Sequence, residues 1–343
     1  MTGRSLFLVA PESPSSLPPE SVLLGLPMIR RTVLAAERAG FDSIAVAADD
    51  PADSLTRALA GTSARLVPSG APIPSGAAVL RWNRVLRTGE IKQLATGASP
   101  APAGVAVSSA ADRRPAERWL LDGLVKDTEG FMSRHFERRV SLEISRRLSA
   151  TSITPNQMTV FSTAVGLVGA LFFLSPRASM QTAGALLFLL HSILDGCDGE
   201  IARLKFQESR WGGLLDFWGD NAVHAAIFAC IAIGWSQSIG QAWPLWVGLA
   251  AVAGTLASAG VVHQSTMQRS KEGPLFTSVT PVADSPLSRV VDLLGRRDFI
   301  YLVLALSLFG RAQWFLLASA VGAPIFSVVL AALARRHAQS PNR

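Results

Sequence analysis

The chain has 343 residues, of which 49% are hydrophobic and only 17% are charged, with a formal net charge of +7. A soluble globular domain carries about 25% charged residues. The shortage is local, because residues 1–150 contain 34 charged residues and the 193 residues of 151–343 contain 23. This distribution excludes a uniform soluble domain, a disordered chain and a disulfide scaffold. It predicts a polar N-terminal part followed by a membrane-embedded part.

Residues 1–105 have the pattern of a small α/β domain. Leu6–Ala10 and Ser43–Ala48 have the apolar composition of strands, and Pro27–Gly40 has helical periodicity with a glycine at its end. The segment 97–111 is rich in Ala, Pro, Gly and Ser, which indicates a linker. We therefore expect residues 1–105 to fold as a cytosolic domain.

Residues 106–150 are expected to contain this linker and a juxtamembrane helix. Phe131–Leu148 carries five arginines among apolar residues. This composition is typical of an amphipathic helix that lies on an anionic leaflet. A solvated linker helix is the alternative, because the periodicity is imperfect.

Residues 151–338 are predicted to form an α-helical membrane domain with six transmembrane helices. The six apolar stretches are Thr159–Ser175, Met180–Leu194, Ala222–Trp235, Trp243–Val262, Phe299–Gly310 and Trp314–Ala334. A helix needs about 20 apolar residues to cross a bilayer, and the fourth and sixth stretches have that length. The second, third and fifth would extend into their more polar ends. A buried soluble core is the alternative.

Basic residues alternate between the two sides of these stretches. The second and fourth connections are basic, whereas the first, third and fifth contain two arginines in all. By the positive-inside rule, we expect a multi-pass protein of the cell (inner) membrane with both termini in the cytoplasm. The N-terminus lacks a long apolar run, so no signal peptide is expected. The net positive charge is attributed to the cytoplasmic face, and no nucleic-acid partner is expected.

Four aspartates stand at two predicted helix ends. Asp195 and Asp198 are three residues apart, and Asp216 and Asp220 are four apart, so each pair shares one helix face. A tight cytoplasmic turn would bring the pairs together. Carboxylates beside apolar helices need compensating charge, and their hard oxygen ligands suit Mg²⁺ or Mn²⁺. Two such ions can bind a diphosphate and activate an attacking oxygen.

The residues between the aspartates complete a longer spacing, Asp-x2-Asp-Gly-x2-Ala-Arg-x8-Gly-x3-Asp-x3-Asp. The eight matching positions are Asp195, Asp198, Gly199, Ala202, Arg203, Gly212, Asp216 and Asp220. The small residues leave room for a ligand or a neighbouring helix, and an arginine can bind phosphate with its planar fork. This pattern resembles the signature of the CDP-alcohol phosphotransferase family.

The resemblance implies a membrane enzyme with six transmembrane helices and a cytosol-facing metal site, which displaces CMP from a CDP-linked alcohol by the hydroxyl of a second alcohol. It implies that Asp195, Asp198 and Asp216 are metal ligands and that Asp220 is both ligand and general base. It places Gly199, Ala202 and Gly212 at the cytidine and Arg203 at the diphosphate. Members of the family are often homodimers, so a homodimer is expected here.

A second short motif precedes the first apolar stretch. Residues 154–159 resemble the Pro-Asn-x-x-Thr that opens the first helix of this family, which makes Asn156 and Thr159 candidate nucleotide contacts. The alternative is a plain helix start, with Thr154 as the cap and Pro155 at the first helical position.

The acceptor site is less defined. Arg269 and Lys271, in the long loop after the fourth stretch, would suit a phosphorylated polyol, although the positive-inside rule alone also explains them. His224 lies four residues beyond Asp220 and could face the site. Hydrogen bonding within the bundle is the alternative for this histidine.

The N-terminal part carries a further resemblance. Gly25–Val46 resembles the early helix and second strand of nucleotidyltransferase-like domains, as in the archaeal inositol-phosphate cytidylyltransferase/di-myo-inositol-phosphate phosphate synthase type. An active domain would have a glycine-rich phosphate loop after its first strand, whereas Pro11–Ser16 contains no glycine. We expect a degenerate, non-catalytic remnant.

Three functions remain open from the sequence. The first is phospholipid synthesis from CDP-diacylglycerol and a small polyol or polyol phosphate. The second is the same chemistry with a soluble donor such as CDP-inositol. The third is a membrane transporter or metal-binding scaffold, which would explain the aspartates but not the fixed spacing of the glycines and Arg203.

Overall fold

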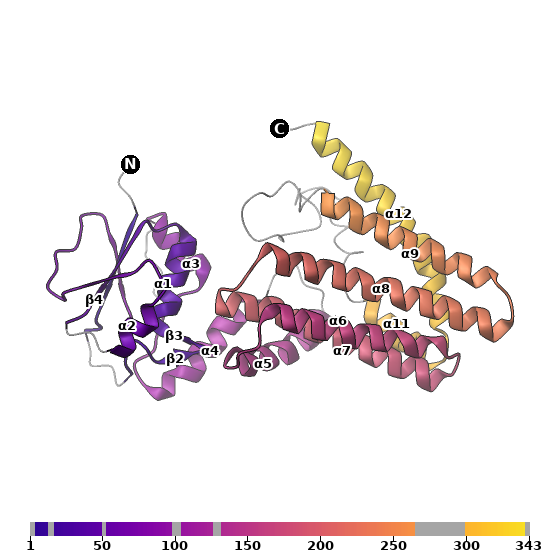
Figure 1. Ribbon diagram of the computed structural model, residues 1–343, viewed down its shortest axis with the longest axis horizontal. Helices are drawn as coiled ribbons and strands as arrows, with labels where there is room; N and C mark the ends of the chain where they lie inside the picture. The colour runs from indigo at the N-terminus through magenta and orange to yellow at the C-terminus, as the bar shows by residue number, and fades with distance from the viewer. Residues whose placement is uncertain are drawn as a thin grey trace. The chain divides into compact units, whose positions relative to one another are not determined.

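The computed structural model describes residues 4–12, 17–49, 53–97, 104–125, 132–264 and 299–339 (Figure 1). The chain divides into two compact units. The N-terminal unit contains Met1–Lys126 and two short later segments, Arg146–Ser152 and Arg203–Phe206. The C-terminal unit contains Asp127–Ser145, Ile153–Ala202 and Gln207–Arg343.

The N-terminal unit is built on a parallel sheet in the order β5-β4-β1-β6. Its strands are β1 (Ser5–Val9), β4 (Ser43–Ala47), β5 (Arg65–Val67) and β6 (Ala78–Arg81). Strand β1 is central, and Leu6 pairs with both Ile44 and Ala78. Its three middle residues are buried, as is typical of a strand with covered faces. The two predicted strands are confirmed to within one residue at each end.

Helix α1 (Met28–Ala39) follows β1 and confirms the predicted helix. It buries Ile29, Val33 and Ala36 on one face, and it ends at Gly40, whose φ of 83° is left-handed. The shorter helices of the unit are α2 (Asp53–Leu59), α3 (Thr88–Ala95), the 3₁₀ turn Ala110–Asp112 and α4 (Arg113–Asp122). Two small antiparallel pairs complete it, β2 (Val22–Leu23) with β3 (Leu26–Pro27) and β7 (Arg84–Val85) with β8 (Val105–Ala106).

The predicted juxtamembrane helix forms, but its buried face is polar. A π-helical segment over Ser133–Glu137 leads into α5 (Arg138–Ser149). The buried residues recur every four positions and are Glu137, Ser141, Ser145 and Ser149. Phe136 and Val140 are exposed instead. The small serine side chains permit close packing of this helix through its polar side.

Five helices are long and apolar enough to cross a membrane. They are α6 (Pro155–Leu171, extended by a 3₁₀ turn at Phe172–Leu174), α7 (Ala178–Lys205), α8 (Arg210–Ile239), α9 (Trp243–Val262) and α12 (Ala312–Gln339, apolar over Ala312–Leu333). The fifth predicted stretch corresponds to α11 (Phe299–Leu308), which has ten residues and falls short of a full span. Six spans are therefore not confirmed within the described residues.

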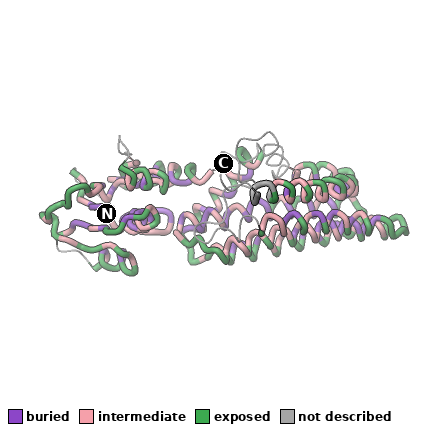
Figure 2. Tube along the Cα trace, turned by 90° about the horizontal axis from the view of Figure 1, so that it is seen from above, coloured by how far each residue is buried: buried purple, intermediate pink, exposed green. Residues whose placement is uncertain are grey.

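The helices of the C-terminal unit bury an apolar core and present an apolar exterior. Phe188, Val223 and Ile227 are buried, whereas Leu249 and Val328 are more than half exposed. Figure 2 shows buried residues along the inner sides of these helices and exposed residues along their outer sides. Since lipid chains are as apolar as leucine, this exterior is that of a membrane protein.

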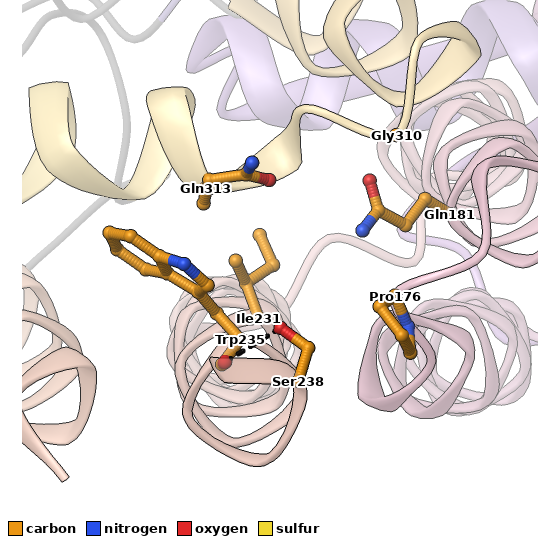
Figure 3. Close-up of a pocket in the computed structure, with 7 residues that line it drawn as sticks. All are labelled: Pro176, Gln181, Ile231, Trp235, Ser238, Gly310 and Gln313. Atoms are coloured by element: carbon orange, nitrogen blue, oxygen red, sulfur yellow. Dashed lines mark hydrogen bonds between the residues drawn. The ribbon is translucent and has the colours of Figure 1, made fainter. Parts of the chain in front are cut away.

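A small cavity lies at one end of the helical unit (Figure 3). Its lining residues are Pro176, Gln181, Ile231, Trp235, Ser238, Gly310 and Gln313. The Gln181 side chain accepts a hydrogen bond from the Ala312 backbone N–H at 3.2 Å. Gln181 precedes Asp195 by about 20 Å along α7, at 1.5 Å per residue, so this cavity is separate from the acidic motif.

Candidate metal centre and active site

Three of the four motif aspartates converge in the C-terminal unit. Asp195 and Asp198 lie on α7 and Asp216 lies on α8, and each offers a carboxylate oxygen within 4.8 Å of the others. A short turn joins the two helices, and the Ser209 hydroxyl oxygen accepts the Gly212 N–H at 3.0 Å to cap α8. Asp195 and Asp198 are only 5% and 6% exposed. The turn thus brings together carboxylates that lie 21 positions apart in the sequence.

The chemistry of this cluster fits a divalent cation. Carboxylate oxygens of Asp195, Asp198 and Asp216 lie within 4.8 Å of one another, and ionised carboxylates so close together are stable only when a proton or a cation compensates their charge. The Oδ1 atom of Asp216 is buried and has no hydrogen-bond partner in the described part of the chain. All three ligands offer hard oxygen atoms, as Mg²⁺ and Mn²⁺ prefer.

Asp198 has a partner on a third helix. The Thr159 hydroxyl of α6 donates a hydrogen bond to the Asp198 carboxylate. Thr154 caps α6 by accepting the Gln157 N–H at 3.3 Å, and Pro155 occupies the first turn. The helix-start interpretation of this segment is confirmed. The structure also places Thr159 against a motif aspartate, which orients that carboxylate.

Asp220 has a histidine partner. The Nε2 atom of His191 lies 3.4 Å from Oδ1 of Asp220, and its Nδ1 lies 2.9 Å from the Ser162 carbonyl oxygen. His191 is buried and lies one helical turn before Asp195. Sequence reasoning missed it, although its spacing of four residues from Asp195 is the signal that would have identified it.

His224, by contrast, lies in an aromatic cluster. Its ring centroid is 5.6 Å from both Phe188 and Phe299. It therefore packs in the core of the helical unit.

The remaining predicted residues are distributed around the aspartates. A Cβ atom on Gly212 would lie 2.9 Å from Oδ1 of Asn156, so the starts of α6 and α8 meet at these two residues. Gly199 follows Asp198 directly on α7, and Ala202 is buried one turn farther along the same helix. Arg203 follows directly and belongs to the N-terminal unit. Arg269 and Lys271 lie outside the described residues.

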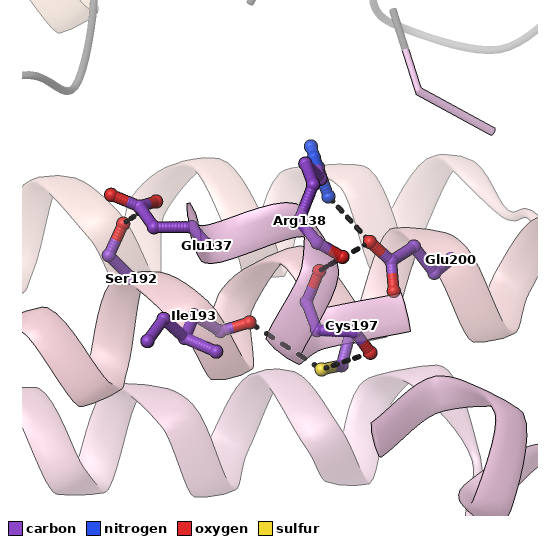
Figure 4. Close-up of polar contacts among 7 residues, drawn as sticks. Glu137, Arg138, Ser192, Ile193, Cys197 and Glu200 are labelled. Atoms are coloured by element: carbon purple, nitrogen blue, oxygen red, sulfur yellow. Dashed lines mark hydrogen bonds and ion pairs between the residues drawn. The ribbon is translucent and has the colours of Figure 1, made fainter. Parts of the chain in front are cut away.

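Two buried glutamates form hydrogen bonds that join α5 and the π-helical segment before it to α7, the helix that carries Asp195 and Asp198 (Figure 4). Glu200 accepts hydrogen bonds from Arg138 Nη1 and the Ser141 hydroxyl, both at 2.7 Å. Glu137 accepts from the Ser192 hydroxyl at 3.2 Å and from the Tyr301 hydroxyl at 3.0 Å. These contacts lie on either side of Asp195 and Asp198 on α7. Neither glutamate is predicted from the sequence, because the signature leaves their positions unspecified.

The helical unit is similar in sequence to known proteins. The family model of CDP-alcohol phosphatidyltransferases matches residues 152–321. The chain is 40% identical over 139 residues to the bifunctional IPC transferase and DIPP synthase of Thermococcus kodakarensis, and 32% identical over 188 residues to the protein so named in Rubrobacter xylanophilus. It is 29% identical over 113 residues to the phosphatidylinositol phosphate synthase of Mycobacteroides abscessus.

These matches cover parts of each protein. They span 40%, 53% and 32% of this chain and 30%, 41% and 50% of the respective relatives. The matched regions thus reach at most half the length of these relatives.

Proposed function

We propose that this membrane enzyme transfers a phosphoalcohol group from a CDP-alcohol to the hydroxyl of a second alcohol. The premise is that residues 152–321 match the family model of CDP-alcohol phosphatidyltransferases. In this reaction the acceptor oxygen forms a bond to phosphorus, and the bond to CMP breaks. The observation that carries the proposal is the convergence of three carboxylates from α7 and α8 within 4.8 Å, two of them buried and that of Asp216 partly buried.

The four aspartates would hold Mg²⁺ or Mn²⁺ in a two-metal site, with Asp195, Asp198, Asp216 and Asp220 as ligands. When bound, such ions neutralise the diphosphate and stabilise the departing CMP. Asp220 also accepts the proton of the acceptor hydroxyl, which is general-base catalysis. Its contact with His191 supports this role, because a histidine that is itself hydrogen-bonded fixes the orientation of the carboxylate.

The donor would be bound by the residues around the aspartates. Arg203 would bind the diphosphate, and Gly199, Ala202 and Gly212 would line the cytidine, where a larger side chain would occupy the space of the base. The proximity of Asn156 to Gly212 supports a nucleotide contact for Asn156 as well. Thr159 would act through Asp198, to which it is hydrogen-bonded.

The preferred donor is CDP-diacylglycerol and the preferred acceptor a small polyol or polyol phosphate. The five candidate membrane helices support a lipid-linked donor. The relative from Mycobacteroides abscessus, by its name, makes phosphatidylinositol phosphate, which supports a phosphorylated acceptor. We assign Arg269 and Lys271 to the acceptor, since basic residues would bind its phosphate.

A soluble donor such as CDP-inositol is the second candidate. It is favoured by the 40% identity to a protein named as an IPC transferase and DIPP synthase. The parallel sheet of the N-terminal unit supports it too, because such sheets are common in nucleotide-binding domains.

We interpret residues 1–105 as a degenerate nucleotidyltransferase-like domain, residues 106–150 as linker and juxtamembrane helix, and residues 151–338 as the catalytic membrane domain. Directly after β1 the chain reads Ala10-Pro11-Glu12, and the Glu12 carboxylate pairs with Arg81. An acidic side chain there would repel a triphosphate. The rest of the predicted loop, residues 13–16, lies outside the described residues.

The decisive experiment follows CMP release by the full chain purified in detergent with Mn²⁺ or Mg²⁺. CDP-diacylglycerol and CDP-inositol are each supplied with inositol, inositol phosphate or glycerol phosphate, and products are identified by mass. CMP formation that requires both donor and acceptor supports the transferase. CMP release with CDP-inositol but not with CDP-diacylglycerol would overturn the preferred donor. The absence of CMP release with both donors would contradict the proposal. Asp195→Asn is the inactive control.

A further inference from the structure

The end of α7, between the two halves of the acidic motif, belongs to the N-terminal unit. Its segment Arg203–Phe206 contains the last turn of α7 and the first residue of the connection to α8. Arg203 is the first residue of this segment. The contacts that hold residues 203–206 in place therefore determine the position of the Arg203 side chain.

A buried arginine on α1 binds this segment. Arg31 is 4% exposed, and its Nη1 donates a hydrogen bond to the Leu204 carbonyl oxygen at 3.0 Å. Its Nη2 donates to the carbonyl oxygens of Leu23 and Leu24 at 2.9 and 3.0 Å. The last carbonyls of a helix have no partner within the helix, so Arg31 provides one for α7.

The charge of Arg31 suits this position. Burial lowers the pKa of Arg31 to about 10, partly offset by Glu117, and the guanidinium therefore remains charged at neutral pH. A positive charge is favourable at a helix C-terminus because of the helix dipole. The contact thus combines hydrogen bonds with a dipole interaction.

Phe206 anchors the same segment from the other side. Its φ of 57° is left-handed, a conformation in which a helix usually ends on glycine and which is strained for a bulky residue. Its side chain packs against the apolar core of the N-terminal unit. The guanidinium carbons of Arg38 and Arg31 lie 4.9 and 5.8 Å from its ring centroid. These contacts stabilise a phenylalanine where the backbone alone favours glycine.

The turn that presents the two carbonyls to Arg31 is itself packed tightly. Leu24 and Gly25 have φ values of 47° and 79°. A Cβ atom on Gly25 would lie 1.9 Å from the Ser149 carbonyl oxygen, so no other residue fits there. Lys205 Nζ donates to the Thr151 carbonyl oxygen at 2.7 Å. The turn before α1, the end of α5 and the end of α7 thus form one packed cluster.

We propose that Arg31 and Phe206 are positioning residues of the transferase, which hold the C-terminal end of α7 so that Arg203 is presented to the diphosphate of the CDP-alcohol. This inference rests on the proposed function, because it assumes that Arg203 binds the donor. By this inference the N-terminal unit positions the end of α7, a role that requires no nucleotidyltransferase activity.

The test compares Arg31→Met with Arg30→Met in the full chain in detergent. Arg30 is a matched control, because it lies on the same helix and donates to two backbone carbonyls, those of Ala58 and Ala60, outside the cluster. Two quantities are measured, amide hydrogen exchange over residues 203–209 and the affinity for CDP with Mn²⁺.

For Arg31→Met, we expect about tenfold faster exchange in this segment and about tenfold weaker CDP binding, since a charged hydrogen bond is lost. KM for the donor should rise more than kcat falls, and Arg31→Lys should restore part of the affinity. Arg30→Met should leave exchange and CDP affinity unchanged. Equal values in the two methionine variants would overturn the proposal.

Phe206→Gly provides a second test if Arg31→Met does not fold, because glycine suits the left-handed backbone while the ring is removed. Faster exchange with weaker CDP binding supports the proposal, and wild-type values contradict it. If the wild-type protein releases no CMP from either donor, the proposed function fails, while the exchange comparison still decides whether Arg31 holds the α7 end.

Discussion

At the scale of single residues, the four motif aspartates have different surroundings. Asp195, Asp198 and Asp216 lie together, and Thr159 donates to one of them. Asp220 contacts His191, which in turn contacts the Ser162 carbonyl oxygen. Different partners suit different tasks, because a metal ligand needs only its oxygens, whereas a base must also be aimed at the proton it accepts.

Asp220→Asn tests the role of the base. The amide keeps the size of the carboxylate but does not accept the proton of the hydroxyl. We expect CDP affinity within a few-fold of wild type and CMP release slower by about 10² to 10⁴, the usual contribution of general-base catalysis. CMP release near the wild-type rate would show that another group takes the proton.

His191→Gln tests the orientation of Asp220. Loss of the ring contact should lower kcat about tenfold, because small displacements of catalytic groups are costly, and CDP affinity should stay unchanged. His224→Gln is the matched control, since His224 also lies within a spanning helix but packs against Phe188 and Phe299. Equal kcat values for the two variants would show that His191 does not orient Asp220 for catalysis.

Metal binding can be measured without turnover. Mn²⁺ at about 100 times its Kd should stabilise the folded protein by about 2.7 kcal/mol, as for any ligand of the native state. We expect Mn²⁺ to raise the Tm of the wild-type protein and EDTA to reverse the rise. Asp216→Asn should show a much smaller rise, and a full rise in this variant would place the metal elsewhere.

At the scale of elements, α5 and the segment before it bind α7 through polar groups. Glu137 and Glu200 are buried, and their partners come from Arg138, Ser141, Ser192 and Tyr301. A helix held in this way keeps its apolar residues Phe136 and Val140 free for another surface. We interpret this exposed face as the one that meets the membrane, in keeping with its neighbouring arginines.

Glu200→Ala should weaken this attachment. Removing one partner of a buried ion pair costs about 3 to 5 kcal/mol, and since the Arg138 side chain is 19% exposed, we expect about 2 to 3 kcal/mol here. The measurement is thermal unfolding in detergent. Glu143→Ala, which removes an exposed glutamate on α5, should change stability by less than about 0.5 kcal/mol. Equal destabilisation by both variants would contradict the role of the pair.

At the scale of the whole molecule, the proposed orientation places the acidic motif and both termini in the cytoplasm. The exposed residues Gln207 and Gln237 lie just before α8 and near its C-terminal end. The native cysteines, Cys197 and Cys230, are buried. A single added cysteine therefore reports on its own end of α8.

In intact cells, a membrane-impermeant maleimide should label Gln237→Cys. Gln207→Cys should be labelled only after permeabilisation, because it would lie on the cytoplasmic side. The wild-type chain is the control and should stay unlabelled. The reverse labelling would place the active site on the other side of the membrane and contradict the positive-inside prediction.

Features that depend on local pattern could be predicted from the amino-acid sequence. Strands β1 and β4, helix α1 and the long membrane helices follow from hydropathy and periodicity. The aspartate pairs follow from spacing along a helix. The sixth span stays a prediction, because the described part of α11 has ten residues and a spanning helix needs about 20.

Contacts between residues far apart in the chain could not be predicted in this way and are known from the folded structure. His191 meets Asp220, Glu137 meets Tyr301, and Arg31 meets Leu204, over separations of 29, 164 and 173 residues. The folded structure also shows that α5 buries Ser141, since Glu200 on α7 offers this serine a carboxylate rather than an apolar surface. The physical reason is that a buried polar group is stable only beside its partner, and the partner is chosen by packing between helices rather than by spacing within one.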